Sequence, residues 1–324
     1  MHSITRTKII AIASVLVPPA AVAAATAQQF PGSKPIEMTV LLAAGSAVDI
    51  TARHLADGMA RELATPVPVV NRTGGGGAIG YSFVKHQRPD GHSIIWNSNS
   101  ISITYHGGML PFDYTAFDAV ARVSVETPAL AVRADAPWKT LADLIEYAKA
   151  NPSKVRIGNS GISSHTHFAE SALFIGAGAK VTDVPFGEGQ ALANLLGQRV
   201  EGIVQLPAAL VSHVKSGELR VLAMLGSKRD PIFPDAPTAT ELGFPVVLDM
   251  WRGIAAPKGT PKPVIAKLEV AVKQSVESQA FKEAGDAIGF TPAFLPAADF
   301  TKLIANDDRR LGEVMADLGL KKSK

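Results

Sequence analysis

The stretch MTVLLAAGSAVDITAR, residues 38–53, decides the fold that this sequence predicts. Its first part, Met38–Leu42, is an apolar run short enough for a buried strand, and small residues follow from Ala43 to Ala47. Apolar residues then recur at helical spacing as far as Leu63, and Asp49 suits the cap or first turn of that helix. A strand that turns on small residues into a helix leaves unpaired backbone N–H groups where the helix dipole is positive. The stretch therefore suits an anion-binding βα turn, although an ordinary structural turn has the same pattern.

Residues 1–27 have the pattern of a secretory signal peptide. Arg6 and Lys8 form a basic start, Ile9–Val17 is apolar, and Ala25-Thr26-Ala27 is an A-x-A cleavage site. The apolar part is too short to span a membrane. Arg6 and Lys8 are the only charged residues in 1–27, so cleavage lowers the formal charge from +3 to +1. A nearly neutral exported chain without a Lys/Arg cluster is not expected to bind nucleic acid or a membrane surface.

The rest of the chain alternates strand-like apolar runs with helical patterns. This order predicts an α/β fold with mostly parallel sheets covered by helices on both faces. The length suits two domains. We expect residues 28–130 to form the first part of lobe 1, residues 131–248 to form lobe 2, and residues 249–324 to return to lobe 1 and end in helices. Two α/β units joined by more than one crossing predict a hinged cleft that closes on a ligand.

Small polar loops follow four of the predicted strands, around Ser46, Ser98, Ser164 and Gln205. In sheets of this kind, ligands bind beyond the carboxyl ends of the strands. These loops are therefore the candidate binding site.

One motif raises the alternative of a nucleotide cofactor. Gly75-x-Gly77-x-x-Gly80 follows a predicted strand and precedes a predicted helix, as the dinucleotide fingerprint does. Asp90 is too near in the sequence to be the ribose partner, and an exported protein is not expected to retain a loosely held nicotinamide. We favour a tight structural or ligand-proximal loop, and we predict no cofactor.

Three further motifs raise enzymatic alternatives. His165-x-His167 supplies two metal ligands where a catalytic zinc needs three, so we predict no metal site. Gly158-Asn159-Ser160-Gly161 departs from the G-x-S-x-G nucleophile elbow. Arg252 either faces a ligand carboxylate or has a structural role. We predict no catalysis, and an exported hydrolase that uses the histidines is the alternative.

Nine short stretches, taken in order and with their spacing, match a known family: Phe30–Ile36, Val70–Gly80, Pro89–Gly91, Leu110–Asp113, Gly161–Ala169, Ser216–Ala223, Ser227–Arg229, Phe233–Thr238 and Ala256–Pro261. Together they make the chain resemble the periplasmic solute receptors of tripartite tricarboxylate transporters, the Bug family. The resemblance covers nearly all of the chain after the leader.

The resemblance implies a two-lobed periplasmic-binding-protein (Venus-flytrap) fold, a periplasmic location, a monomer, and membrane permease subunits as partners. It also implies that backbone N–H groups and ordered waters at the first βα loop hold a ligand carboxylate. The residues expected there are Ala44, Gly45, Ser46, Ala47 and Asp49. Further contacts are expected from Ser98, Asn99, Ser163, Ser164, His165, Phe186 and Gln205.

The sequence departs from the family pattern in ways that bear on the ligand. The first loop is usually proline-rich and continues as Gly-Gly-Gly-Thr-Asp, whereas Ala43–Asp49 here reads AAGSAVD. Gln205-Leu206 stands where the family often has Asp-Ser, and Phe186 where tyrosine is common. Two anion-receiving loops with an apolar wall predict a dicarboxylate, an aromatic diacid such as terephthalate being one candidate. A monocarboxylate, or a polar di- or tricarboxylate such as citrate, is the alternative, and sensing is the alternative to transport.

Overall fold

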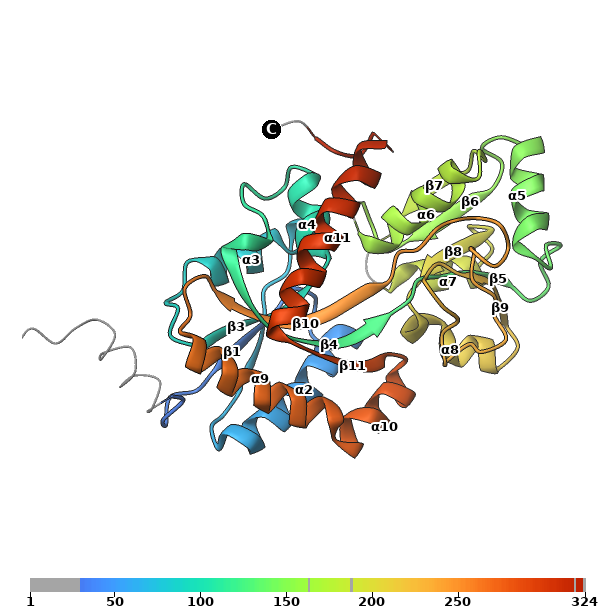
Figure 1. Cartoon of the computed structure of the whole chain (residues 1–324). Coiled ribbons are helices and arrows are strands. Elements are labelled where there is room, and N and C mark those ends of the chain that lie inside the picture. Colours follow the sequence, from blue (N-terminus) through green and yellow to red (C-terminus); the bar gives the residue numbers. More distant parts are fainter. Residues whose placement is uncertain (1–29, 163, 187–188, 318, 323–324) are drawn as a thin grey trace, which may run out of the picture.

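The computed structural model describes residues 30–162, 164–186, 189–317 and 319–322, which form two α/β lobes (Figure 1). The predicted signal peptide, residues 1–27, lies outside the described residues, as does Ser163. Within the described part of the chain, no helix combines the length and the apolar character needed to cross a membrane.

The sheet of lobe 1 has the strand order β11-β4-β10-β3-β1-β2. The bounds of its strands are β1 Glu37–Val40, β2 Val69–Asn71, β3 Ser93–Ser98, β4 Phe117–Glu126, β10 Met250–Pro257 and β11 Thr291–Pro296. Strand β1 runs parallel to β2 and β3, whereas β10 lies antiparallel between β3 and β4. Successive residues of a strand face opposite sides of the sheet. Ile94 and Ile95 accordingly belong to two different apolar cores.

Helices cover both faces of this sheet. Their bounds are α2 Ala47–Leu63, α3 Ala78–Lys85, α4 Ser100–His106, α9 Lys262–Glu277, α10 Gln279–Ile288 and α11 Ala297–Asp317, with short 3₁₀ turns at Gly75–Gly77 and Tyr114–Ala116. Leu55 and Met59 of α2 pack with Leu268 of α9 in the core on one face. Phe300 of α11 packs edge-on against Trp251 in the core on the other. Each large side chain buried in this way stabilises the fold by about 1.5–3 kcal/mol.

The sheet of lobe 2 has the strand order β7-β6-β8-β5-β9. Its strands are β5 Ala129–Arg133, β6 Arg156–Asn159, β7 Thr182–Pro185, β8 Gly202–Gln205 and β9 Leu219–Met224. Its helices are α5 Leu141–Ala150, α6 His165–Gly176, α7 Gln190–Leu196 and α8 Pro207–Lys215. Strand β6 runs parallel to β7 and β8, whereas β5 lies antiparallel between β8 and β9.

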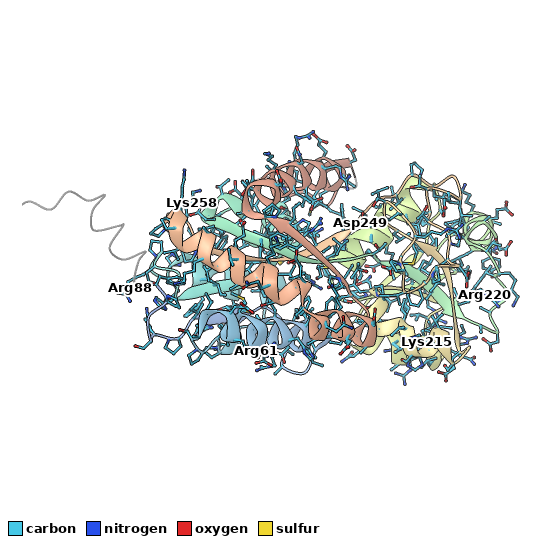
Figure 2. All side chains as sticks on the ribbon, turned by 60° about the horizontal axis from the view of Figure 1, so that its bottom comes forward. Arg61, Arg88, Lys215, Arg220, Asp249 and Lys258 are labelled. Carbon is cyan, nitrogen blue, oxygen red and sulfur yellow. The ribbon has the colours of Figure 1, made fainter. Side chains whose placement is uncertain are left out.

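The chain crosses between the sheets twice, after Glu126 and before Met250. Most strands of each sheet run in one direction and helices flank both sheets, as the sequence predicted; the exceptions are β10 and β11 in lobe 1 and β5 in lobe 2, which run antiparallel to their neighbours. The predicted boundary at 130/131 falls inside β5, and the one at 248/249 falls just before β10. Figure 2 places Asp249, in the returning segment, at the junction of the two lobes.

Candidate ligand-binding site

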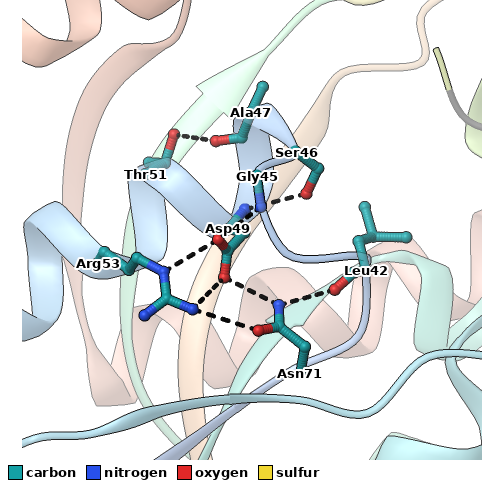
Figure 3. Close-up of polar contacts among 8 residues, drawn as sticks. All are labelled: Leu42, Gly45, Ser46, Ala47, Asp49, Thr51, Arg53 and Asn71. Atoms are coloured by element: carbon teal, nitrogen blue, oxygen red, sulfur yellow. Dashed lines mark hydrogen bonds and ion pairs between the residues drawn. The ribbon is translucent and has the colours of Figure 1, made fainter.

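The turn from β1 into α2 is built around the carboxylate of Asp49 (Figure 3). Ser46 is the N-cap of α2, and its Oγ accepts a hydrogen bond from the backbone N–H of Asp49 at 3.2 Å. The Asp49 carboxylate accepts from the backbone N–H of Gly45 at 2.9 Å and from Asn71 Nδ2 at 2.8 Å. Arg53 donates to both of its oxygens, through Nε and Nη2, at 3.0 Å each. The loop is therefore fastened to the helix and to β2 through one side chain.

Asp49 holds the loop through its carboxylate, whose hydrogen bonds are made to partners within the protein. Its side chain is turned inward and the residue is only 2% exposed. Burial by itself raises the pKa of Asp49, but hydrogen bonds from Arg53, Gly45 and Asn71 outweigh it and hold that pKa below its ordinary value. The carboxylate is therefore a permanent acceptor that positions the loop.

Replacing Asp49 with alanine is expected to lower the free energy of unfolding by about 1–3 kcal/mol, because the N–H of Gly45 and the amide of Asn71 lose their partner. Urea denaturation measures the difference. Asp57→Ala, an exposed aspartate on the same helix, is the matched control and is expected to change stability by less than about 0.5 kcal/mol. Equal effects of the two substitutions would remove the positioning role of Asp49.

The other residues of this turn leave bare backbone at the surface. Ala44, Gly45 and Ala47 are exposed, and Gly45 has φ +82°, a left-handed conformation that glycine adopts without strain. The backbone N–H groups of Ala47 and Val48 have no hydrogen-bond partner among the described residues. A helix start with unpaired N–H groups and a positive dipole end is suited to a carboxylate.

A second helix start of the same kind lies in lobe 2, at α6. Ser164 is its N-cap, and Ser164 Oγ accepts from the backbone N–H of His167 at 3.1 Å. Thr166 Oγ1 accepts from the backbone N–H of Ser160 at 3.0 Å and so ties the loop to the helix. Within the described chain, no hydrogen bond is made by the backbone N–H groups of His165 and Thr166. Lobe 2 therefore offers a second place for an anionic group.

The loops of the two lobes meet on the returning segment. Asn99, at the start of α4 in lobe 1, donates from Nδ2 to the Asp249 carbonyl at 3.1 Å. His165, at the start of α6 in lobe 2, contacts the adjacent Leu248 carbonyl through Nε2 at 2.8 Å. These contacts, each made by a buried side chain, bring the candidate loops of both lobes to one place.

His165 is held as a neutral ring. Burial lowers its pKa to about 4, with the nearby charge of Arg252 adding to the effect. A carbonyl only accepts hydrogen bonds, so Nε2 carries the proton and Nδ1 is an acceptor. Neither Nδ1 of His165 nor Oδ1 of Asn99 has a hydrogen-bond partner in the described part of the chain. Both atoms are therefore buried acceptors without a donor among the described residues.

The remaining predicted contacts are partly committed to the protein itself. Ser98 Oγ lies 2.6 Å from Ser100 Oγ in a buried network that includes the Tyr81 hydroxyl. Gln205 Oε1 accepts from Ser160 Oγ at 3.0 Å. Phe186 is half-buried, and its ring covers Gly158 so closely that a Cβ there would lie 2.8 Å from the ring. Phe186 therefore helps to form the wall of lobe 2.

Comparison with known proteins shows the family to which the chain belongs. The sequence pattern of the tripartite tricarboxylate transporter family receptor, TctC, matches residues 51–320. The chain belongs to this family. Protein BugT of Bordetella pertussis is 30% identical over 321 residues, which cover 97% of this chain and 98% of BugT. These findings confirm the resemblance that the sequence motifs indicated.

Two solved structures from Rhodopseudomonas palustris are similar to this receptor. One has malate bound, with a TM-score of 0.76 and 26% identity over 88% of this chain and 99% of the other. The other is with adipate, with a TM-score of 0.81 and 26% identity over 90% of this chain and 98% of the other. The fold is that of a two-lobed periplasmic binding protein, and the chain is a solute-binding receptor, not an enzyme.

The sequence did not single out the polar group beneath the start of α6 in this receptor. Asn159 Nδ2 donates to Glu170 Oε2 at 2.7 Å and to Asp183 Oδ1 at 2.5 Å, and Asn159 Oδ1 accepts from the backbone N–H of Gly161 at 2.9 Å. Burial raises the pKa of Glu170 to about 9, so its carboxyl is protonated at neutral pH. The available signal was a glutamate on the buried face of α6, four residues before Phe174.

The residues of the single motifs have the following surroundings in the structure. Arg252 is buried and pairs with Glu126, with Nε 3.1 Å from Oε1, so its role is structural. Gly80 lets α3 approach β1, since a Cβ there would lie 2.4 Å from a Leu41 methyl group. His167 lies 3.3 Å from Asp183 through Nε2. Among the described residues, no group of three His, Asp or Glu side chains is placed to hold a metal ion.

Proposed function

We propose that this receptor captures a small organic dicarboxylate in the periplasm and delivers it to the permease subunits of a tripartite transporter. The observation that carries the proposal is the pair of helix starts, α2 in lobe 1 and α6 in lobe 2, whose first N–H groups are unpaired among the described residues. One carboxylate at each start would bridge the lobes. The pattern of residues 1–27 supports export, and the family supports the permease as partner.

The relatives support two carboxylates over one. Malate and adipate, the molecules in the two R. palustris structures, are both dicarboxylates of different length and polarity. A family that accepts both holds the carboxylates with shared features of the fold and selects the middle of the ligand with side chains that vary. Backbone N–H groups at helix starts are such shared features, because they do not depend on side-chain identity.

The side chains near the second helix start favour an apolar middle. Ile162, in the loop before α6, is 74% exposed, the highest exposed fraction among the large apolar side chains of the described residues. Leu206 and Phe186 are half-buried on the same edge of lobe 2. A flat or aliphatic ligand body would cover these side chains, and terephthalate is a candidate that fits this description. We assign the ligand contacts to the loops at Ala44–Ala47, Ser98–Asn99, Ser164–His165, Phe186 and Gln205.

Calorimetry with terephthalate, its mono-acid analogue benzoate, adipate and citrate tests the proposal. A site formed for two carboxylates leaves one polar group unpaired when a mono-acid binds, at about 1–3 kcal/mol, so benzoate is expected to bind one to two orders of magnitude more weakly than terephthalate. Equal affinities for terephthalate and benzoate would contradict the dicarboxylate assignment. Tight binding of citrate alone would contradict the apolar middle and leave the receptor role unchanged.

A further inference from the structure

A cavity of about 750 Å³ lies at the junction of the two lobes, and none of the candidate ligand-binding residues lines it. We refer to it as the hinge pocket. Lobe 1 contributes walls from β4, β11 and α11, and lobe 2 contributes the segment Ser227–Pro231 together with Val247. The crossing segments contribute Thr127 and Asp249, and Figure 2 shows Asp249 between α11 and lobe 2.

The strand order places the hinge pocket and the candidate site on opposite sides of the crossing strands. In lobe 1, β4 and β11 lie on one side of β10, and β3 and β1 lie on the other. In lobe 2, β9 lies on one side of β5, and β8 and β6 lie on the other. The hinge pocket is lined by residues of β11 and β4 and by the Ser227–Pro231 segment that follows β9, whereas the loops at Ser46, Ser98, Ser164 and Gln205 follow β1, β3, β6 and β8.

Two cationic side chains of the hinge pocket, one from each lobe, have hydrogen-bonding capacity to spare. Arg122 of β4 donates through Nε to the Ala293 carbonyl at 2.9 Å, and its other guanidinium nitrogens donate to no other described residue. Burial lowers the pKa of Arg122, although the nearby charge of Asp249 acts to raise it. The positive charge of Arg122 is therefore not fully compensated. Lys228 of lobe 2 is exposed and makes no hydrogen bond or ion pair with the described residues.

The acidic side chains of the hinge pocket are, by contrast, already engaged. Asp249 accepts from Thr127 Oγ1 at 3.0 Å and from Ser227 Oγ at 2.7 Å. Asp307 accepts from the indole N–H of Trp251 at 2.9 Å, and Asp230 accepts from a backbone N–H at 2.9 Å. Burial raises the pKa of both Asp230 and Asp307. The groups with spare capacity are cationic, so the hinge pocket favours an anion.

Both lobes also contribute apolar side chains to a lining that is otherwise polar or charged: Val125, Leu295 and Leu303 from lobe 1, and Pro231 and Val247 from lobe 2. Such a surface gains stability when it is covered by hydrocarbon, at roughly 25 cal/mol per Å² of apolar area removed from water. An inorganic anion would leave it uncovered. A volume of about 750 Å³ is within the range of pockets that hold small organic ligands.

We propose that the hinge pocket binds a small aliphatic monocarboxylate as a second ligand, with its carboxylate towards Arg122 and Lys228 and its alkyl chain on the apolar lining. The occupant contacts both lobes from the side of the hinge opposite the candidate site. Closure of the lobes on one side of the crossing strands changes the spacing on the other. The two ligands are therefore coupled, and each changes the affinity of the receptor for the other by the same factor.

Calorimetric titration of the full mature receptor with hexanoate tests this site. Lys228→Gln removes one of the two spare cations at an exposed position and is expected to weaken hexanoate binding at least tenfold. Lys215→Gln is the matched control, because Lys215 is also an exposed lysine of lobe 2 but lies well away from Asp249 (Figure 2). It is expected to leave the affinity within twofold. Hexylamine, which has the same chain and the opposite charge, is not expected to bind.

A variant with Ser46→Ala and Ser164→Ala separates the hinge pocket from the candidate site. Both substitutions alter the helix starts of the candidate site and leave the lining of the hinge pocket unchanged, so hexanoate binding is expected to persist. Loss of hexanoate binding in this variant, together with full binding by Lys228→Gln, would place the mono-acid at the candidate site and overturn the proposal. Absence of hexanoate binding to the unmodified receptor at millimolar concentration would also overturn it.

Discussion

Replacing Arg252 with alanine is expected to lower the free energy of unfolding by about 3–5 kcal/mol, because it leaves the charge of Glu126 buried without a partner. Both side chains are more than nine-tenths buried, and Arg252 donates to both Glu126 oxygens, at 3.1 and 3.4 Å. The pair lies where β4 leaves lobe 1 and β10 returns to it, so the loss falls on the strands that join the lobes. Urea denaturation measures the change.

A double variant shows whether the effect comes from the unpaired charge. Arg252→Met combined with Glu126→Leu replaces the ion pair with apolar side chains of similar volume, an exchange that is often neutral or stabilising. It is expected to recover most of the lost stability and to keep ligand affinity within about threefold, because the guanidinium of Arg252 is buried and bound to Glu126. A destabilisation below about 1 kcal/mol in Arg252→Ala would show that Glu126 finds water or another partner. Loss of ligand affinity in the folded double variant would show that Arg252 contributes to ligand binding.

The helix starts that form the candidate site could be predicted from the sequence because their signals are local. Ser46 and Ser164 are N-caps that precede helical patterns, and each makes its capping hydrogen bond within three residues. Helix α6 spans His165–Gly176, directly after its cap Ser164. A cap, a run of small residues and an apolar period are all contained in one short window of sequence.

The contacts that orient the site could not be predicted, because their partners are far apart along the chain. Asp49 is turned inward by Asn71, and His165 is fixed by the carbonyl of Leu248, 83 residues later. The edge strand β11 is recognisable only through its pairing with β4, which is interrupted by a register shift. The seven-residue helix α4 begins at Ser100, within the polar stretch Asn97–Ser100, whose composition predicts a loop. Each of these features depends on tertiary contacts.

The antiparallel pairing of the crossing strands also could not be predicted from the sequence, because it too depends on tertiary contacts. An apolar run does not show in which direction its strand pairs, because side chains alternate between the two faces of the sheet every two residues in both parallel and antiparallel pairing. Strands β4 and β10 pair over most of their length although more than a hundred residues separate them in the sequence. The hinge pocket is a consequence of that pairing, because its walls come from β4, β11, α11 and the Ser227–Pro231 segment.

Replacing Glu170 with glutamine is expected to stabilise the receptor at alkaline pH and to flatten the pH dependence of its stability. The carboxyl of Glu170 titrates near its ordinary pKa of 4.5 in the unfolded chain and at about 9 in the folded one, chiefly because it is buried. Between these pH values only the folded state binds this proton. The stability linked to it is fully present below about pH 4.5 and is lost as the pH rises towards 9, at about 1.4 kcal/mol per pH unit.

The unmodified receptor is therefore expected to lose about 4 kcal/mol of this contribution between pH 5 and pH 8, a loss that Glu170→Gln does not share. Glutamine keeps an acceptor for Asn159 Nδ2 and carries no proton that titrates in this range. Thermal and urea unfolding from pH 5 to pH 8.5 measure the slope.

Glu146→Gln on the exposed face of α5 is the control and is expected to leave the slope unchanged. Asp183→Asn, which removes the negative charge nearest to Glu170, is expected to reduce the slope in part. Parallel pH profiles for the unmodified receptor and Glu170→Gln would show that Glu170 is not protonated in the folded state, and that the start of α6 rests on an ionised carboxylate.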